Sequence, residues 1–404
     1  MNTTLFCYFL IFLLSGYAAQ GQGLAKYQEI AATQNPELQA AYKAFEQALQ
    51  RVAQAGHLPD PSISLGYFLS PVETRVGPQR WRLGLSQQFP WFGTLKAERS
   101  LAAEQAEAQY QVFLGRKKQV QYEVAQAYFP LYEQQALLRI EAQNLDLLSS
   151  YKQVAQARLA RNQGRLSEVL RIELAEKEAQ ARRRILAQQK PSLLAAFNQL
   201  LHRKLSEPAV IPQNIGLPTP PPRLEADSLW KLQPSLTALQ LRQQASATKQ
   251  ELASKQRKPS LGVGLSYIGV GPRSDASPAD QGKDAFLPQV SLNIPIARKK
   301  YAAAEQEAQL EKAQYALQQE SLKQKILTQY EQLYFQLAEQ QELFTLYQRQ
   351  VEQGQQLLEI LFAEYSNGDS SFEEVIRLQQ QILDYQKKQV RAKVRYRQAL
   401  AELQ

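Results

Sequence analysis

Few residues of this chain could support covalent or metal chemistry. Its only cysteine is Cys7 and its only methionine is Met1, so ligands for soft metals are almost lacking. The two histidines, His57 and His202, stand at the ends of helical stretches without a matching acid or metal-ligand spacing. No phosphate-binding glycine loop, nucleophile elbow or zinc motif occurs. We therefore expect no enzyme activity, no catalytic residue, no cofactor and no metal site.

The chemistry that the sequence does offer is partitioning between lipid and water. Four segments, at about 61–70, 80–90, 259–269 and 286–296, alternate apolar residues with small or polar ones at a period of two, which predicts β-strands. Strands of roughly ten residues with an apolar outer face, a polar inner face and aromatic residues near their ends are typical of a water-filled membrane barrel. The residues expected to face lipid are Ile63, Leu65, Tyr67, Trp81, Leu83, Leu85, Phe89, Leu261, Val263, Leu265, Tyr267, Val290, Leu292 and Ile294.

Two alternatives bear on these strands. A soluble β-sandwich would also alternate, but its polar face would point outward and need not be small, whereas Ser62, Ser64 and Gly66 are small. Four strands cannot close a membrane barrel, because single-chain barrels begin at about eight strands and open edges are not tolerated in lipid. Two copies would give eight strands and a filled interior, whereas three would give twelve strands and room for a channel. We therefore expect a trimer.

An internal duplication organises the rest of the chain. Asn35–Leu38 corresponds to Gln233–Leu236, and Glu168–Arg171 corresponds to Glu374–Arg377. Each half shows the same order of a moderate helix, two short strands, a very long helix and a return helix. We predict a signal peptide at 1–21, a first repeat at 24–207, a Pro-rich connector at 208–224 and a second repeat at 225–404.

Long helices must carry the strands. We predict them at about 94–163 and 166–205 in the first repeat, and at 297–366 and 370–402 in the second. At 1.5 Å per residue the longest would extend about 100 Å if continuous, which exceeds a compact domain. Apolar residues along 297–366 recur at spacings of three, four and seven, a coiled-coil pattern that requires partner helices.

The N-terminal segment predicts export. An apolar run at Leu5–Leu14 is followed by small residues and is too short to span a bilayer, which is typical of a secretory signal peptide. Cys7 lies inside it, so we expect an exported chain without a disulfide or a lipid-attachment cysteine. The net charge of +9 could suggest nucleic-acid binding, but export argues against it. We therefore interpret basic clusters such as Arg182–Arg184 as solvated helix faces, and we expect no nucleic-acid partner.

Two segments next to the strands carry a family resemblance. Leu58–Pro61 before the first strand and Ser86–Gly93 at the end of the second resemble TolC-type outer-membrane efflux factors, with the heavy-metal efflux branch the most similar. The resemblance implies a mainly α fold with a membrane β-barrel portion: a trimer with a twelve-stranded barrel in the outer membrane and a helical tunnel in the periplasm. It also implies three kinds of partner, namely a periplasmic membrane-fusion adaptor, an inner-membrane resistance-nodulation-division transporter and outer-membrane lipid. The implied function is passive exit of substrates, with heavy-metal cations as a candidate cargo.

The same resemblance places both helix reversals at the periplasmic tip. The residues assigned to the tip and to adaptor docking are Gly164, Leu166, Ser167, Glu168, Val169, Gly368, Ser370, Ser371, Phe372 and Glu373. Gly164 and Gly368 suit a chain reversal, and the serines could cap the returning helices. If three copies converge there, acidic side chains would repel one another and nearby arginines would compensate. This reasoning gives candidate gate residues at Arg161, Arg165, Arg171, Glu364, Asp369 and Arg377.

The main alternative is a secreted coiled-coil scaffold or adhesion protein of the cell envelope that conducts nothing. Such a protein should extract without detergent, whereas a barrel should need detergent and run as a heat-modifiable trimer. An autonomous porin fits less well, because most of the chain is predicted helix. The sequence leaves the cargo and the pump open.

Overall fold

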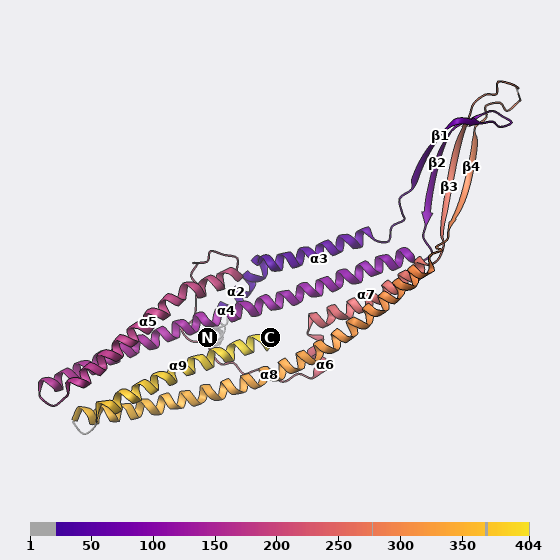
Figure 1. The fold of residues 1–404 in the computed structure, drawn as a ribbon. Helices are drawn as coiled ribbons and strands as arrows, with labels where there is room; N and C mark the ends of the chain where they lie inside the picture. Colours follow the sequence, from indigo (N-terminus) through magenta and orange to yellow (C-terminus); the bar gives the residue numbers. More distant parts are fainter. Residues whose placement is uncertain (1–21, 277, 368–370, 404) are drawn as a thin grey trace, which may run out of the picture. The chain divides into compact units, whose positions relative to one another are not determined.

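The computed structural model describes residues 22–276, 278–367 and 371–403, which are mainly helical with one small sheet (Figure 1). This confirms the predicted fold class. The predicted signal peptide at 1–21, and Gly368, Asp369 and Ser370 of the predicted tip, lie outside the described residues. Within the described part of the chain, no helix is both long and apolar enough to cross a membrane.

The elements follow one another in the same order in both halves of the chain. The first half contains α2 (Gln22–Gln34), α3 (Pro36–Gln54), β1 (Ser62–Val72), β2 (Gln79–Phe89), α4 (Thr94–Ala160) and α5 (Leu166–Leu200). The second half contains α6 (Ala226–Lys231), α7 (Pro234–Gln256), β3 (Ser260–Val270), β4 (Ala285–Asn293), α8 (Arg298–Asn367) and α9 (Phe372–Leu403). Both α3 and α7 begin with proline, whose missing N–H costs nothing at the first position of a helix.

The chain forms two compact units, each built from both halves of the sequence. The helical unit comprises the described residues within 1–40, 115–228 and 324–404. The sheet unit comprises 41–114 and 229–323.

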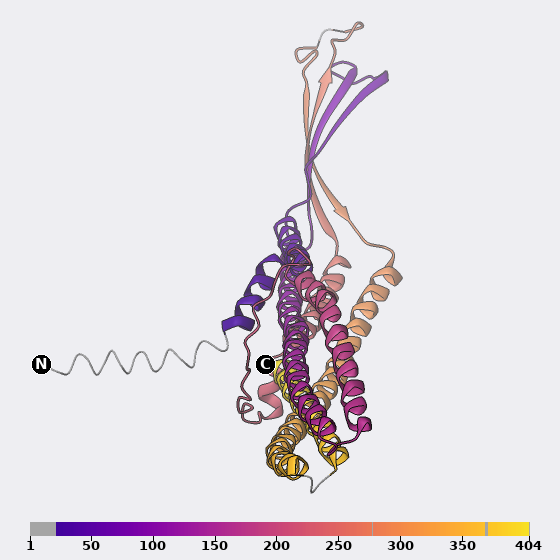
Figure 2. The ribbon, with the colours of Figure 1, turned by 90° about the vertical axis from the view of Figure 1, so that its left-hand side faces the viewer.

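The helical unit is held together by aromatic cores. In it α5 lies beside α4, and α9 lies beside α8 (Figures 1 and 2). The largest core joins Tyr27 of α2, Tyr128 of α4, Phe197 of α5 and Val394 of α9, with the Tyr27 and Phe197 rings edge to face at 5.0 Å. A second core next to the reversals contains Tyr365 and its neighbours on α4, α5 and α9.

The predicted connector is packed against the helical unit. Ile215 is buried in the largest core, and tyrosine hydroxyls bond the connector backbone. Tyr396 donates to the Pro218 carbonyl at 2.6 Å and Tyr334 to the Pro221 carbonyl at 2.7 Å, while the amide of Leu224 donates to Tyr330 at 2.6 Å. Several proline residues leave the connector few amide donors, so side-chain hydroxyls satisfy its backbone carbonyls.

Two elements end earlier than predicted. α5 ends at Leu200 rather than near 205, because His202 adopts a left-handed φ of 50° and Arg203 N–H bonds back to the Asn198 carbonyl at 3.2 Å. β4 ends at Asn293 rather than near 296, because Pro295 has no N–H to continue a ladder. Ile294 therefore lies just beyond the strand.

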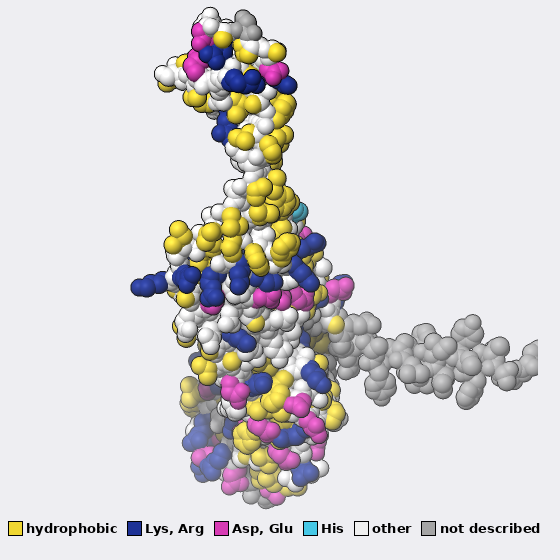
Figure 3. Space-filling view, turned by 90° about the vertical axis from the view of Figure 1, so that its right-hand side faces the viewer, with side chains coloured by type: hydrophobic (Ala, Val, Ile, Leu, Met, Phe, Trp, Pro, Cys, Tyr) yellow, Lys and Arg dark blue, Asp and Glu magenta, His cyan; other side chains and the backbone are white. Residues whose placement is uncertain are grey.

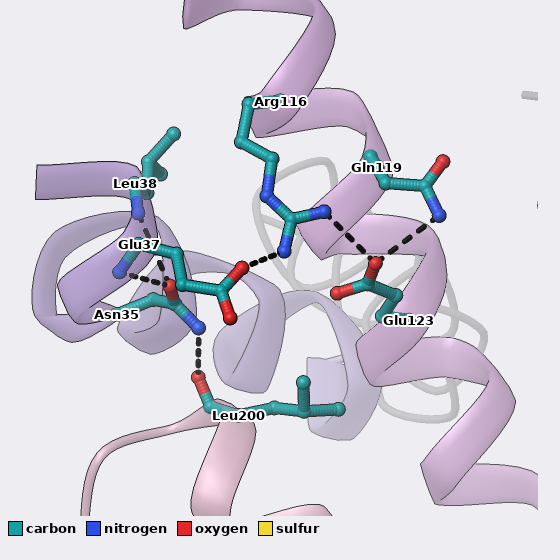
Figure 4. A network of polar contacts seen from close by, with 7 residues as sticks. All are labelled: Asn35, Glu37, Leu38, Arg116, Gln119, Glu123 and Leu200. Atoms are coloured by element: carbon teal, nitrogen blue, oxygen red, sulfur yellow. Dashed lines mark hydrogen bonds and ion pairs between the residues drawn. The ribbon is translucent and has the colours of Figure 1, made fainter. Parts of the chain in front are cut away.

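Asn35 joins three elements of the helical unit (Figure 4). Its side-chain oxygen accepts from the amides of Glu37 at 3.0 Å and Leu38 at 3.2 Å, which caps α3, and its amide donates to the Leu200 carbonyl at 2.9 Å. Arg116 of α4 pairs with Glu37 and, at 3.0 Å, with Glu123. The nearly buried side chain of Asn35 thus supplies hydrogen bonds both to the amides at the start of α3 and to the carbonyl at the end of α5.

The sheet unit contains a four-stranded antiparallel sheet in the order β1-β2-β3-β4. Two hairpins, β1 with β2 and β3 with β4, are joined by pairing of β2 with β3. α7 packs with the adjoining parts of α4 and α8, with Gln244 donating to Glu104 at 3.0 Å and Lys249 bonding Glu307 at 2.7 Å. The sheet thus continues directly into the ends of three helices.

We predict that Asn35→Ala lowers the free energy of unfolding by about 1–3 kcal/mol, because it removes a cap and leaves the Leu200 carbonyl without its donor. Asn35→Ser keeps a capping oxygen and should cost less. Thermal unfolding of the purified full chain, followed by circular dichroism, measures both. Equal midpoints for the wild type and Asn35→Ala would show that this junction does not support the unit.

Candidate functional site

The strand register places the predicted apolar residues on one face of the sheet. Leu65 is directly opposite Leu83, and Leu83 is opposite Tyr267. Leu85 is opposite Leu265. Residues directly opposite each other in an antiparallel pair project to the same side, so these residues share one face across all the strands. We call it the apolar face.

The apolar face is largely open to its surroundings in the single chain. Leu65 and Val290 are 77% and 75% exposed, and no helix of the sheet unit covers them. Trp81 is only 37% exposed, because its ring lies over Gly269, where a Cβ would come within 2.4 Å of the indole nitrogen. An uncovered row of this size is an unusual surface for a water-soluble sheet.

Sequence reasoning missed two residues of this face in β4. Phe286 is 68% exposed and opposite Tyr267, and Pro288 is opposite Leu265. Phe286 has the same period-two parity as Val290, so the alternation could have found it, but Pro288 interrupts the pattern. Within the single chain β4 is an outer strand, a position where a sheet tolerates proline.

The opposite face is small and polar, and we call it the polar face. Arg82 donates to the Ser266 hydroxyl from two nitrogens at 3.1 and 2.9 Å, and the hydroxyls of Ser62 and Ser86 lie 2.7 Å apart. Glycines alternate with these residues in β2 and β3. Ile268 and Leu287 share this face near the hairpin end, but most of its side chains are hydroxyls, amides or guanidinium groups, which suit contact with water.

Aromatic side chains bound the apolar face at both ends. At the hairpin end the rings of Trp81 and Tyr267 are 5.2 Å apart and those of Tyr267 and Phe286 are 5.0 Å apart. At the helix end lies Phe89, followed by exposed Trp91. Trp81 to Phe89 extends about 26 Å along the strand at 3.3 Å per residue. Before tilt, that length is close to the apolar band of about 25 Å in membrane barrels.

The two outer strands leave unpaired edges. β1 pairs only with β2 and β4 only with β3 among the described residues. Each outer edge therefore presents backbone N–H and C=O groups that a further strand could pair.

The first helix reversal turns at Asn162. Asn162 has a left-handed φ of 57°, and its flanking amides close the end of α4: Gln163 N–H bonds the Arg158 carbonyl at 2.9 Å and Asn162 N–H bonds Leu159 at 3.0 Å. Gly164, which the sequence suggested for this role, does not have a positive φ and lies close to Arg158. Asparagine tolerates the left-handed region because of its short polar side chain.

Capping at the two returning helices differs from one to the other. Ser371 accepts from the Glu373 amide at 3.1 Å and so caps α9 as predicted. α5 begins after Arg165 rather than Ser167, and there the Glu168 carboxylate reaches back to the Arg165 amide at 3.5 Å. Ser167 therefore lies inside the first turn and is not the cap.

A buried tyrosine joins the two reversals within the chain. Tyr365, 1% exposed, donates to the Glu168 carboxylate at 3.0 Å. Arg158 stacks 4.5 Å from the ring centre and bonds the Tyr365 carbonyl, while its other nitrogen bonds Gln163 at 3.0 Å. Burial, and then the bond to Glu168, raises the pKa of Tyr365 to about 12, so the phenol stays a donor near neutral pH. Sequence reasoning missed both Arg158 and Tyr365, because their contact is not local.

The predicted gate arginines divide into two kinds. Arg171 of α5 pairs with Glu373 of α9 at 3.6 Å, and Arg377 pairs with the same carboxylate from within α9 at 3.3 Å. Arg161 and Arg165 have no ion pair to any described residue, and Glu364 is exposed without one. Leu166 is also exposed, whereas Val169 and Phe372 are buried in the core beside the reversals.

The C-terminal part of the chain is similar to a known family. Residues 227–404 match the family model of the outer membrane efflux proteins. A search of curated protein sequences gives no match. This match supports the predicted family resemblance over these residues, and assignment to the heavy-metal branch stays a prediction.

Solved structures share the fold over nearly the whole chain. The outer membrane protein VceC from Vibrio cholerae is 17% identical, with a TM-score of 0.75 and 94% of each chain covered. A membrane protein from Pseudomonas aeruginosa is 16% identical, with a TM-score of 0.77 and coverage of 94% of this chain and 92% of the other. The open state of the Neisseria gonorrhoeae MtrE outer membrane channel is 17% identical, with a TM-score of 0.75 and coverage of 94% and 88%. At these identities the likeness shows the fold.

Proposed function

We propose that this chain is one subunit of an outer-membrane channel through which a tripartite efflux system releases its substrates. The observation that carries the proposal is the sheet, whose apolar face is uncovered and whose polar face is lined by Ser, Gly and Arg82. Lipid would contact the first face and water the second. The family match of residues 227–404 and the shared fold support the same function.

Closure of the barrel requires further copies of the chain. Open sheet edges are not tolerated in the hydrocarbon core, because their backbone groups would lack hydrogen-bond partners. Neighbouring strands alternate in direction in the order β1-β2-β3-β4, so β4 of one copy can pair antiparallel with β1 of the next. Three copies give a ring of twelve strands with the polar faces inward and space for a channel.

The helices would form the periplasmic part of the assembly. Exposed apolar side chains such as Leu317 at 73% and Phe335 at 66% have no cover within the chain, as expected if neighbouring copies pack there. The family resemblance assigns the reversals to docking of a periplasmic adaptor, which connects the channel to an inner-membrane resistance-nodulation-division transporter. Exposed Leu166 and Glu373 would be available to such a partner.

The reversals would also close the resting channel. The bond from Tyr365 to Glu168 and the pairing of Arg171 with Glu373 hold the α4/α5 and α8/α9 hairpins together. A closed state that depends on a few such contacts can be opened by a partner that binds the open state better.

We predict that Leu65→Arg with Val290→Arg prevents assembly, whereas Ser64→Arg with Gln289→Arg does not. All four residues are exposed in the single chain, and each control is the chain neighbour of a test residue on the opposite face. An arginine on the lipid face costs up to about 2–4 kcal/mol near mid-bilayer, and symmetry would repeat the cost in each copy. The measurement is the amount of heat-modifiable trimer in detergent extracts of outer membranes.

Equal tolerance of both pairs would contradict the assignment of the two faces. Extraction of the wild-type chain without detergent would instead favour the envelope scaffold. We also expect the variant with Ser64→Arg and Gln289→Arg to show altered ion selectivity in planar bilayers, because it adds cations to the channel wall.

We predict that Arg171→Ala with Arg377→Ala raises the open probability of single channels in planar bilayers without adaptor. Loss of the Arg171 pair should weaken the contact between the two hairpins, and loss of the Arg377 pair leaves Glu373 without a counter-charge within α9; each exposed pair contributes about 0.2–1 kcal/mol. Arg161→Ala with Arg165→Ala is the matched control, because it removes the same charge from the reversals without breaking an ion pair. The same change in both double variants would point to general charge rather than to these contacts.

For the cargo we propose heavy-metal cations, which the resemblance to the heavy-metal branch supports. Loss of the gene should then sensitise the cell to copper, zinc or cadmium salts more than to apolar drugs. Growth of deletion and complemented strains on both classes of compound measures this. Sensitivity to drugs alone would assign the channel to a drug pump and leave the channel function intact.

A further inference from the structure

Basic side chains gather where the sheet meets the helices. They come from the start of α4, the end of α7 with the linker into β3, and the start of α8. We call the set the basal collar: Lys96, Arg99, Lys255, Arg257, Lys258, Arg298, Lys299 and Lys300. In Figure 3 a band of dark blue side chains lies below the apolar side chains at this end of the sheet.

Contacts between the helix ends bring the collar together. Lys255 at the end of α7 donates to the Gly93 carbonyl, just before α4, at 3.4 Å. Arg257 pairs with Glu305 of α8 at 3.8 Å. The same helix end thus contacts both other helices, so the collar is one surface rather than three separate clusters.

Most of the collar forms no ion pair within the described part of the chain. Lys255 pairs with Glu251 at 2.6 Å and Arg257 with Glu305. The others are exposed and have no ion pair with any described residue. Lys300 only lies over the Tyr301 ring, at 5.7 Å.

The placement opposes the ordinary rule for helix stability. The first turns of α4 and α8 contain no acidic residue, and cations follow at once instead. The N-terminus of a helix carries a partial positive charge, so added cations there are unfavourable unless an anion binds. Positions that break a local rule are expected at functional sites.

An apolar layer separates the collar from the strands. Phe92 and Ile296 are 89% and 88% exposed, and Trp91 and Ile294 are exposed beside them. Apolar residues next to a row of cations match the change from acyl chains to headgroups at a membrane surface.

The hairpin end of the sheet has a different charge pattern. Arg75 pairs with Asp280 at 3.7 Å, and Arg273 pairs with Asp275 at 2.6 Å. Arg80 and Lys283 form no ion pair with a described residue, but the two loops contain as many carboxylates as cations, so their charge is balanced overall. The unmatched positive charge is therefore a property of the helix end of the sheet.

We propose that the basal collar binds the phosphate groups of anionic phospholipids in the leaflet on the helix side of the sheet. The inference rests on the proposed function, since it requires the sheet to lie in a membrane. Lysines supply point charges and arginines can bond two phosphate oxygens at once. Repetition in each copy would surround the barrel with such sites and fix its depth in the bilayer.

The test measures lipid selectivity of the full chain reconstituted in vesicles. Spin-labelled phosphatidylglycerol and phosphatidylcholine, observed by electron paramagnetic resonance, give the relative association constant of the two lipids at the protein surface. For the wild type we expect a preference for phosphatidylglycerol of at least about twofold at low salt, decreasing as salt screens the charges. Lys258→Gln, Arg298→Gln and Lys299→Gln together should bring it to near one, and the single substitutions should lower it stepwise.

The matched control replaces as many cations at the hairpin end, with Arg75→Gln, Arg80→Gln and Lys283→Gln, and should keep the preference. Equal selectivity of the wild type and the collar variants overturns the proposal. The proposal is also overturned if the preference for phosphatidylglycerol is lost in inorganic phosphate but kept in chloride of the same ionic strength. The collar would then bind free phosphate. Failure of the wild type to float with either kind of vesicle would reject the membrane channel itself.

Discussion

Strand register is the constraint on which the rest of this molecule depends. Side chains alternate between the faces of a strand, so a slip of one residue would move every apolar side chain to the other face. The row formed by Tyr67, Trp81, Tyr267 and Phe286 across the strands resists such a slip, because each ring packs in one register only. The two faces, the unpaired edges of β1 and β4, and the position of the basal collar beneath the strands all follow from that register.

Local patterns made much of this predictable from the sequence. Alternation is a property of neighbouring residues, so the apolar residues from Ile63 to Leu292 could be assigned to one face before their partners were known. The duplicated segments Asn35–Leu38 and Gln233–Leu236 contain the first residues of α3 and α7. The exceptions are also local. Pro288 interrupts the alternation, so Phe286 was not assigned to the apolar face, and Pro295 ends β4 before Ile294.

Contacts between distant residues were beyond such reasoning. Tyr365 and Glu168 are 197 residues apart in sequence, and no spacing rule connects them. The turn at Asn162 depends on a backbone conformation that Gly164 seemed better suited to adopt. The connector shows the same limit, because its proline content suggests a free linker while tyrosines from α8 and α9 fix it in place.

The shared core of Tyr27 and Val394 has a consequence for how the chain is made. Tyr27 lies in α2, the first described helix, and Val394 lies in α9, the last one. Both belong to a single cluster, and the helical unit is assembled from three stretches of sequence. Such long-range contacts form slowly, and a growing chain cannot complete this core until α9 has been synthesised. The four strands lie within 62–293, so all of them are synthesised before this core can close.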